Sequence, residues 1–136
     1  MPVVSFDHIH LRSPDPEATG AWFEQMLGGK ILCGPGRVPG RIDVQFGDVL
    51  LFITSVVEGD GIAAPPVSPH QGLDHIGLTV TEIDALAAEL KGRGVEFTKE
   101  PTTIRPNVRV CFIRGPQGIS IELLERSAPS APAVNG

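Results

Sequence analysis

A five-residue segment near the start of the chain recurs halfway along it. Residues 7–11 read DHIHL and residues 74–78 read DHIGL, so four of five positions match at an offset of 67 residues. Both segments alternate apolar and polar side chains, as a strand with one buried face does. In the first copy the polar face carries His8, His10 and Arg12. The recurrence predicts that the chain consists of two copies of one folding unit.

A helix is expected after each repeated strand. In the first copy Asp15 can cap a helix that begins with a proline, and an apolar stripe then runs as far as Gly28. In the second copy Thr81 and Asp84 have the spacing of a capping box, which predicts a helix that starts at Thr81.

Three short runs of strand-forming residues follow each helix and complete a β-α-β-β-β unit. They are expected at residues 30–33, 41–46 and 49–55 in the first copy, and at 95–99, 108–114 and 119–125 in the second. The predicted fold class is α+β, with two tandem β-α-β-β-β modules. The predicted division is a first module at 1–56, a connector at 57–72, a second module at 73–126 and a disordered tail at 127–136.

Charge and hydropathy exclude several classes of partner. The 11 Lys and Arg residues are outnumbered by 16 Asp and Glu, and no basic run occurs, so we expect no nucleic acid partner. The longest apolar run, Val49 to Ile53, is too short to cross a bilayer, so we expect no membrane partner and a soluble, cytoplasmic protein. The two cysteines, Cys33 and Cys111, are expected to be buried reduced thiols.

The repeat changes the interpretation of two histidines. Either His8 or His75 alone is more readily explained as a structural histidine. Because they occupy the same place in two copies of a strand, pseudo-twofold packing of the copies would bring both to one cleft. Two imidazoles and one carboxylate make a common divalent metal site, and Glu122 interrupts an apolar strand on its polar face.

The other acidic residues are assigned lesser roles. Glu122 could instead be a solvated position on an edge strand, as Glu125 is expected to be. Asp7 and Asp74 precede the histidines, are expected to face away from them and are given structural roles.

Four segments together resemble the vicinal oxygen chelate superfamily. They are residues 8–11, Asp15 with the Trp22-Phe23 pair, residues 74–78 and residues 115–123. The superfamily includes glyoxalase I, methylmalonyl-CoA epimerase, extradiol dioxygenases, fosfomycin-modifying enzymes and bleomycin-binding resistance proteins. The resemblance implies paired modules whose curled mixed sheet surrounds a metal-binding cleft. It also implies that His8, His75 and Glu122 bind one divalent ion, which could be Zn, Ni, Co, Mn or Fe.

The fourth metal ligand of some superfamily members is not expected here. Aligning residues 49–52 with residues 120–123 puts Leu51 where glyoxalase I has a glutamate and the epimerase a glutamine. Leucine cannot bind a metal, so the resemblance implies three ligands from the protein.

Other residues are predicted to line the cleft. His10 shares the face of His8 and is the candidate for acid-base catalysis or for substrate hydrogen bonding. A histidine that supports a metal ligand, or a merely polar wall, would explain it equally well. The candidate substrate-binding residues are Arg12, Asp43, Gln45 and Leu51, the last as part of an apolar wall.

Three functions remain open at this stage. The favoured one is a metal-dependent isomerase or lyase that moves a proton in a small oxygenated substrate. The alternative is a ring-cleaving dioxygenase of the extradiol type with Fe(II) or Mn(II). A metal-free protein that binds an antibiotic is the third. We expect a homodimer, and the cleft could be built within one chain or across two.

Overall fold

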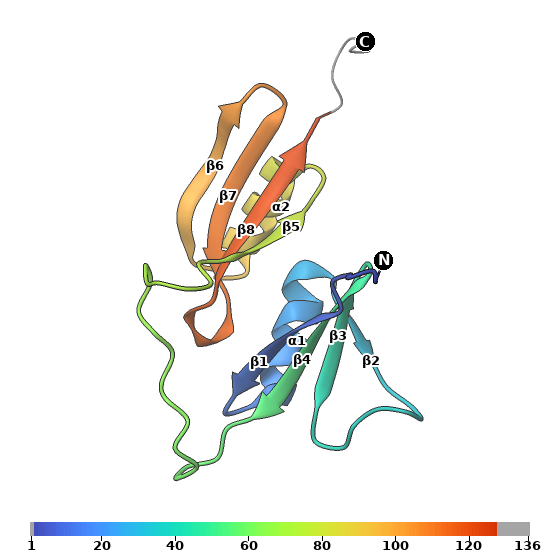
Figure 1. The fold of residues 1–136 in the computed structure, drawn as a ribbon. Coiled ribbons are helices and arrows are strands. Elements are labelled where there is room, and N and C mark those ends of the chain that lie inside the picture. The colour runs from blue at the N-terminus through green and yellow to red at the C-terminus, as the bar shows by residue number, and fades with distance from the viewer. Residues whose placement is uncertain (1, 128–136) are drawn as a thin grey trace. The chain divides into compact units, whose positions relative to one another are not determined.

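The computed structural model describes residues 2–127 and consists of two compact units, divided between Ala64 and Pro65 (Figure 1). The elements of the first unit are β1 (His8–Ser13), α1 (Pro16–Leu27), β2 (Lys30–Leu32), β3 (Ile42–Phe46) and β4 (Val49–Ser55). Those of the second are β5 (Ile76–Thr79), α2 (Ile83–Gly92), β6 (Phe97–Arg105), β7 (Val108–Arg114), the short 3₁₀ helix η1 (Pro116–Gly118) and β8 (Ser120–Arg126).

The two units have the same topology. The strand order is β1-β4-β3-β2 in the first sheet and β5-β8-β7-β6 in the second. In each sheet the first and last strands of the unit pair in parallel, and the remaining neighbours are antiparallel. The predicted α+β class with two tandem β-α-β-β-β modules is therefore confirmed.

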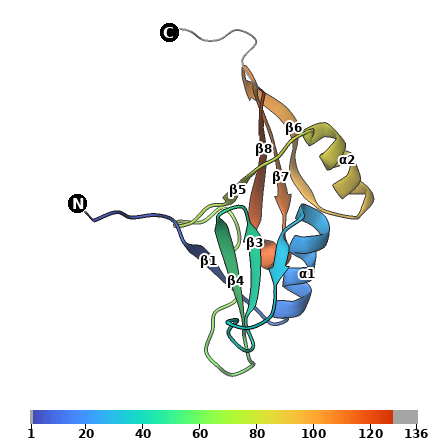
Figure 2. The same cartoon turned by 90° about the vertical axis from the view of Figure 1, so that its right-hand side faces the viewer.

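In each unit one helix covers one face of its own sheet (Figure 2). Helix α1 starts as predicted, because the Asp15 carboxylate accepts a hydrogen bond from the backbone N–H of Ala18, and it ends at Gly28 in the left-handed conformation. Gly20 lets α1 approach β3 closely, since a β-carbon there would lie 2.7 Å from the Ile42 side chain. The faces that meet are apolar, and Phe23 at their centre is fully buried.

Helix α2 begins two residues later than the sequence predicted. The expected capping box does not form. Glu82 is the N-cap residue, in the left-handed conformation and without a side-chain cap of its own. The carboxylate of Glu125 instead accepts hydrogen bonds from the backbone N–H groups of Glu82, at 2.8 Å, and Ile83, at 3.2 Å. Glu125 is thus a helix cap supplied by β8 rather than a merely solvated residue.

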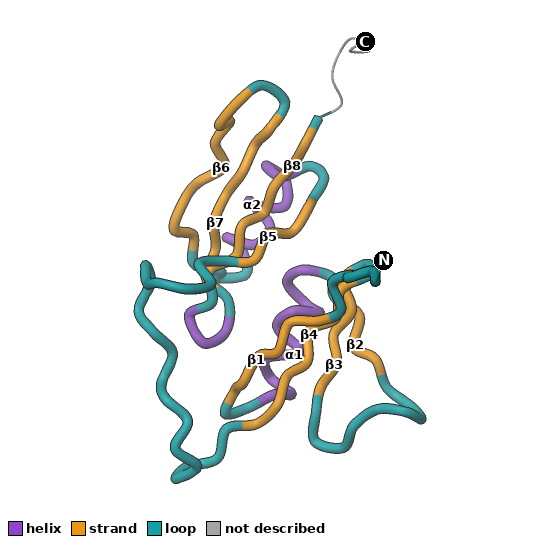
Figure 3. Tube along the Cα trace, viewed as in Figure 1, coloured by secondary structure: helices purple, strands orange, loops and turns teal. Residues whose placement is uncertain are grey.

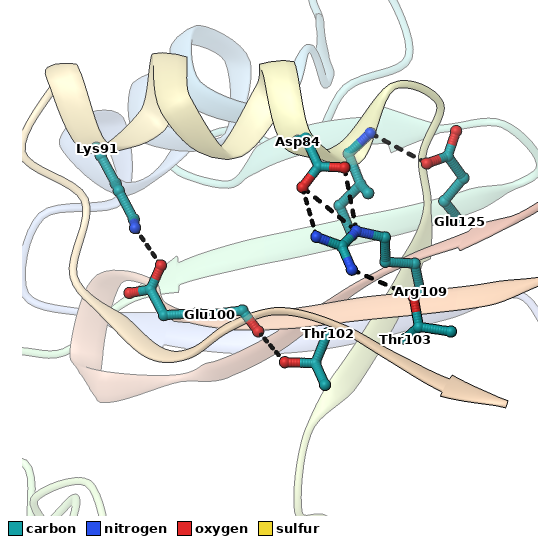
Figure 4. A network of polar contacts seen from close by, with 8 residues as sticks. Asp84, Lys91, Glu100, Thr102, Thr103, Arg109 and Glu125 are labelled. Carbon is teal, nitrogen blue, oxygen red and sulfur yellow. Dashed lines mark hydrogen bonds and ion pairs between the residues drawn. The ribbon is translucent and has the colours of Figure 1, made fainter.

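Polar contacts also join α2 to the sheet beneath it (Figure 4). Asp84, expected in the capping box, forms an ion pair with Arg109 of β7 at 2.7 Å. Arg109 also donates to the Thr103 hydroxyl of β6, and Lys91 near the end of α2 pairs with Glu100. These contacts connect the helix to both β6 and β7 outside the apolar core.

Strand β6 extends to Arg105, whereas the sequence predicted a strand ending at residue 99. The pairing of β6 with β7 is irregular between Lys99 and Thr102, around Pro101. A proline cannot donate a ladder hydrogen bond and is tolerated at bulges and on edge strands. Because β6 lies at an edge of its sheet, the strand continues past Pro101. In the sequence alone, this proline indicates the end of a strand.

The segment from residue 56 to residue 75 contains no helix or strand (Figure 3). It includes the Gly-, Pro- and Ala-rich residues 57–72 that were predicted to form a connector. Of the predicted tail, residues 128–136 lie outside the described part of the chain. Among residues 2–127, no helix is long and apolar enough to cross a bilayer.

The two cysteines differ in environment. Cys111 on β7 is fully buried, as predicted, and burial raises the pKa of its thiol to about 11. Cys33 was also expected to be buried, but it is exposed just after β2. Its apolar neighbours in the sequence do not bury it, because β2 has only three residues and the chain leaves the sheet there.

Replacing Glu125 by alanine should lower the free energy of unfolding by about 0.5–2 kcal/mol, the usual effect of losing an N-terminal helix cap. Urea unfolding measures this. Glu125→Gln should lose less, since the amide oxygen still accepts a hydrogen bond. The exposed Glu58 provides a matched control, and an equal loss in Glu58→Ala would contradict the capping role.

The thiols should react at different rates. In the native protein near pH 8, Ellman's reagent should titrate Cys33 rapidly and leave Cys111 unreacted, because Cys111 is buried and its pKa of about 11 keeps it protonated. In denaturant both should react. In the native state, the Cys111→Ser variant should react rapidly through Cys33, and the Cys33→Ser variant should not react. Rapid reaction of the native Cys33→Ser variant would contradict the assignment.

Candidate functional site

The second unit brings together two of the predicted metal ligands. His75 precedes β5, and Glu122 lies on β8, where it pairs in register with Gly77. The Nε2 atom of His75 is 3.3 Å from Oε1 of Glu122. Both side chains are partly accessible, 32% for His75 and 18% for Glu122, so the pair can be reached from solvent. Strand β8 lies between β5 and β7, so Glu122 is not on an edge strand.

The other ring nitrogen of His75 is also held. Its Nδ1 lies 2.7 Å from the Asp74 carboxylate. A carboxylate can only accept, so the neutral ring carries its proton on Nδ1. The Nε2 lone pair then faces the Glu122 carboxylate, whereas the protonated ring forms ion pairs with both acids. Hydrogen bonding to Asp74, together with the charge of Glu122, raises the pKa of His75 above its usual value, while burial acts in the opposite direction.

The first unit repeats this arrangement at His8. The Nδ1 atom of His8 lies 2.7 Å from the carboxylate of Asp7, as in the second unit. The expectation that Asp7 and Asp74 face away from the histidines was therefore wrong. Each aspartate is adjacent to its histidine in the chain and turns its side chain back to orient the ring. Such carboxylate partners are typical of metal-binding histidines, because they fix the tautomer and the orientation of the ligand.

The His75–Glu122 pair has the spacing of two ligands on one ion. Two ligands that bind at right angles, each at about 2.1 Å, lie about 3 Å apart. The observed 3.3 Å between Nε2 and Oε1 fits this separation. Within residues 2–127, no three His, Cys, Asp or Glu side chains are grouped as a complete metal site. The second unit therefore contributes a pair of candidate ligands, and His8 belongs to the first unit.

The strand registers correct the alignment of the two copies. His8 pairs with Leu50 and His10 with Phe52, whereas Gly77, the counterpart of His10, pairs with Glu122. The counterpart of Glu122 is thus Phe52, one residue beyond the predicted Leu51. A phenylalanine supplies no metal ligand either, so the first unit offers only His8 at this place.

Leu51 does not line the face that carries His8. It pairs with Ile9 and Val44, is 2% exposed and lies on the face that packs against α1. Its assignment to an apolar substrate wall was wrong because a shift of one residue turns a strand side chain to the opposite face. The aromatic ring of Phe52 occupies the accessible face instead and stacks on His8, with ring centroids 4.1 Å apart.

His10 lies on the same face of the first sheet as His8. Its Nε2 is 2.7 Å from the hydroxyl of Thr54 on β4. Burial, followed by the charges of Arg12, His8 and Arg41, holds the pKa of His10 below its usual value. The ring is therefore mainly neutral near pH 7 and can accept a proton.

Two further predicted residues keep their expected face. Arg12 is exposed on β1, and its register partner Thr54 is the residue that binds His10. Gln45 lies on β3 opposite Leu50, and its amide donates to the Gly47 carbonyl in the turn before β4.

Asp43 is buried rather than available to a substrate. It is 1% exposed and accepts hydrogen bonds from two arginines of the preceding loop. Arg41 binds it through Nε at 2.7 Å and Nη2 at 3.1 Å, and Arg37 through Nη1 at 2.9 Å. The guanidinium carbon of Arg41 also lies 3.7 Å from the centroid of the Phe52 ring. The predicted direct contact of Asp43 with substrate is thus replaced by a contact with arginines.

Sequence reasoning missed five residues of these two clusters, namely Asp7, Asp74, Arg37, Arg41 and Phe52. For the aspartates a signal was present, because they recur with the histidines at the offset of the repeat. For the arginines and Phe52 no comparable signal exists, since neither the conformation of the loop nor the register of β4 can be read from composition.

Comparisons with known proteins support one family. A family model described as "Glyoxalase/Bleomycin resistance protein/Dioxygenase superfamily" matches residues 5–123. Glyoxalase I of Saccharomyces cerevisiae is 24% identical over 151 aligned residues, which cover 93% of this chain and 46% of that protein. The chain thus spans about half the length of this curated relative.

Solved structures show the same fold. A glyoxalase family protein from Bacillus anthracis has a TM-score of 0.67 at 22% identity, covering 93% of this chain and 98% of its own. A glyoxalase family protein from Enterococcus faecalis has a TM-score of 0.66 at 25% identity, covering 87% and 94%. A glyoxalase/bleomycin resistance protein/dioxygenase from Nocardioides has a TM-score of 0.64 at 23% identity, covering 100% and 92%.

Replacing Asp74 by asparagine should lower the pKa of His75 in metal-free protein, because the largest cause of its upward shift is lost. An NMR titration of the histidine ring signals measures this. Asp7→Asn is the matched control and should leave the His75 titration unchanged.

The same change should have a pH-dependent effect on stability. A raised histidine pKa stabilises the fold fully below the unfolded pKa of about 6.5 and progressively less as pH rises through the folded pKa. The wild-type protein should therefore exceed Asp74→Asn in free energy of unfolding by more at about pH 5.5 than at about pH 9. An equal difference at both pH values would contradict the assignment.

Proposed function

Because the chain belongs to the Glyoxalase/Bleomycin resistance protein/Dioxygenase superfamily, we propose that it is an enzyme dependent on a divalent metal ion. The proposed ligands are His8, His75 and Glu122. The observation that carries the proposal is the His75–Glu122 pair, whose Nε2 and Oε1 atoms lie 3.3 Å apart while Asp74 holds Nδ1. His8 is supplied by the first unit, either of the same chain or of a second copy in a homodimer.

The donor set suits several metals of one class. Two imidazoles and one carboxylate bind Zn, Mn, Fe, Co or Ni, and three protein ligands leave positions for water and substrate. A bound ion would polarise substrate oxygens and stabilise negative charge that develops on them. We infer a substrate with two neighbouring oxygens, and an isomerase or lyase reaction in which a proton is removed next to a carbonyl.

His10 is the proposed general base. Its Nε2 can donate to the Thr54 hydroxyl at 2.7 Å, which leaves the lone pair of Nδ1 to accept a proton. The Thr54 hydroxyl can either donate or accept, so it fixes the orientation of the ring, and the tautomer with Nε2 protonated is part of the proposal. Thr54 would then be a positioning residue, and Arg12 and Gln45 on the same face would contact the substrate.

The alternative reaction is ring cleavage with Fe(II) or Mn(II). The observation that favours it is Phe52 at the place equivalent to Glu122, which leaves three proposed protein ligands, the number used when O₂ and substrate bind one iron together. Neither reaction requires a fourth protein ligand on the metal ion. The two are separated by the metal and by the reaction observed.

Elemental analysis of protein purified without a tag should find about one divalent ion per complete ligand set, removable by chelation. His8→Ala, His75→Ala and Glu122→Ala should each lower metal occupancy by at least about tenfold after reconstitution, since each removes a ligand. His70→Ala is the matched control. His70 lies in the segment between the two units, and its Nδ1 donates to the carbonyl of the neighbouring Gln71. Full occupancy in two of the three ligand variants would refute the ligand set.

His10→Ala should retain the metal and lose most exchange of the substrate proton with solvent, as followed by NMR in deuterium oxide. Ferrous iron in anaerobically purified protein, together with catechol-dependent O₂ uptake, would instead select the dioxygenase. A protein that binds no metal and folds unchanged after chelation would return the third candidate, an antibiotic-binding protein.

A further inference from the structure

Two arginines of the first unit share one buried carboxylate on the sheet face that carries His8. Each guanidinium carries five N–H donors, whereas Asp43 takes two from Arg41 and one from Arg37. Most N–H donors of the two arginines are therefore not used by Asp43. The two arginines and Asp43 also leave one net positive charge, although the chain as a whole carries −5.

Hydrogen bonds to Asp43 restrain the two arginines, Arg41 more than Arg37. Asp43 is 1% exposed, and Arg41 binds it through two donors while its guanidinium lies 3.7 Å from the Phe52 ring centroid. Fixing a guanidinium in this way removes the entropy that a free arginine loses when it binds an anion. Both arginines nevertheless remain accessible, since their side chains are 22% exposed for Arg41 and 36% for Arg37.

The position of the cluster connects it to the proposed site. The Phe52 ring contacts the Arg41 guanidinium and stacks on His8 at 4.1 Å between centroids. Arg41 and the proposed ligand His8 thus belong to one stack of planar groups. An anion bound by the arginines would lie on the face of the sheet that carries His8, since Asp43 and Phe52 are register partners.

The second unit shows that this arrangement is particular to the first. At the two corresponding places it carries Phe112 on β7 and Glu122 on β8, again as register partners. The acid and the aromatic residue are exchanged between the two strands. In the second unit the acid lies 3.3 Å from the histidine, and the Phe112 ring meets the histidine edge to face with centroids 5.0 Å apart. In the first unit the Phe52 ring stacks on the histidine while the acid holds two arginines.

We propose that Arg37 and Arg41, positioned by Asp43, form a subsite for an anionic group, a carboxylate or a phosphate, of the substrate. The anion would accept charge-assisted hydrogen bonds from the donors that Asp43 leaves unused. That the anion belongs to the substrate rests on the proposed function. That the subsite binds anions is a property of the first unit alone.

The test uses metal-free full-length protein and two probes, inorganic phosphate and acetate. NMR of the arginine Nε–Hε groups should show saturable shifts at Arg37 and Arg41 with at least one probe. Arg37→Gln should raise the dissociation constant about tenfold, because it removes one charged donor group while Asp43 keeps its bidentate partner. Preference for phosphate or for acetate would identify the anion class.

Arg105→Gln is the matched control, since it removes the same charge from an exposed position in the second unit. It should change the dissociation constant by less than about twofold, because an exposed charge that does not contact the anion is largely screened by salt. Arg41→Lys keeps the charge but loses the bidentate contact, and it should weaken binding as well. Absence of saturable shifts, or equal weakening by Arg105→Gln, would overturn the subsite.

Metal analysis of the same sample separates the two proposals. Intact metal binding without anion binding overturns the subsite alone. Saturable anion binding in a protein that takes up no metal removes the proposed function and leaves the subsite.

Discussion

The parallel pairing of the first and last strands in each unit determines which side chains accompany the histidines. Along a strand successive side chains alternate between faces, so the register of β1 on β4, and of β5 on β8, decides what lies beside His8 and His75. In the second unit this pairing puts Glu122 within reach of His75. In the first it puts Phe52 against His8, and through that ring it sets the position of Arg41.

Much of the fold could be predicted because its signals are local or repeated. The alternation of Ile9 and Leu11 with His8 and His10, and the cap at Asp15, depend on neighbours in the chain. The repeat then gave the strand signal a second occurrence at residues 74–78. The prediction for the start of α2 failed for the opposite reason, because its cap comes from Glu125, 43 residues away from Glu82.

The candidate site divides along the same line. The repeat was sufficient to select His8, His75 and, with a face argument, Glu122. It could not show that Leu51 faces α1, because that depends on the strand register. It also could not show that Asp43 is buried, because that depends on a loop whose arginines contact it. A one-residue error in register changes the face of every side chain in β4, and no pattern within residues 49–55 reports it.

The burial of Asp43 requires a physical explanation that the fold alone does not give. Withdrawing a carboxylate from water costs several kcal/mol unless charged partners compensate it, and an apolar residue would fill the same place at lower cost. The second unit does place an apolar residue there, Phe112. A duplicated unit that needed only stability could have kept phenylalanine at both places. The buried acid in the first unit is therefore explained by what it binds, two accessible guanidinium groups on the sheet face that carries His8. Glu122 differs from Asp43, because it is partly exposed and its carboxylate lies 3.3 Å from His75. Exchange of one acid and one aromatic residue between two neighbouring strands is thus enough to give the first unit an arginine cluster and the second an acid aligned with its histidine.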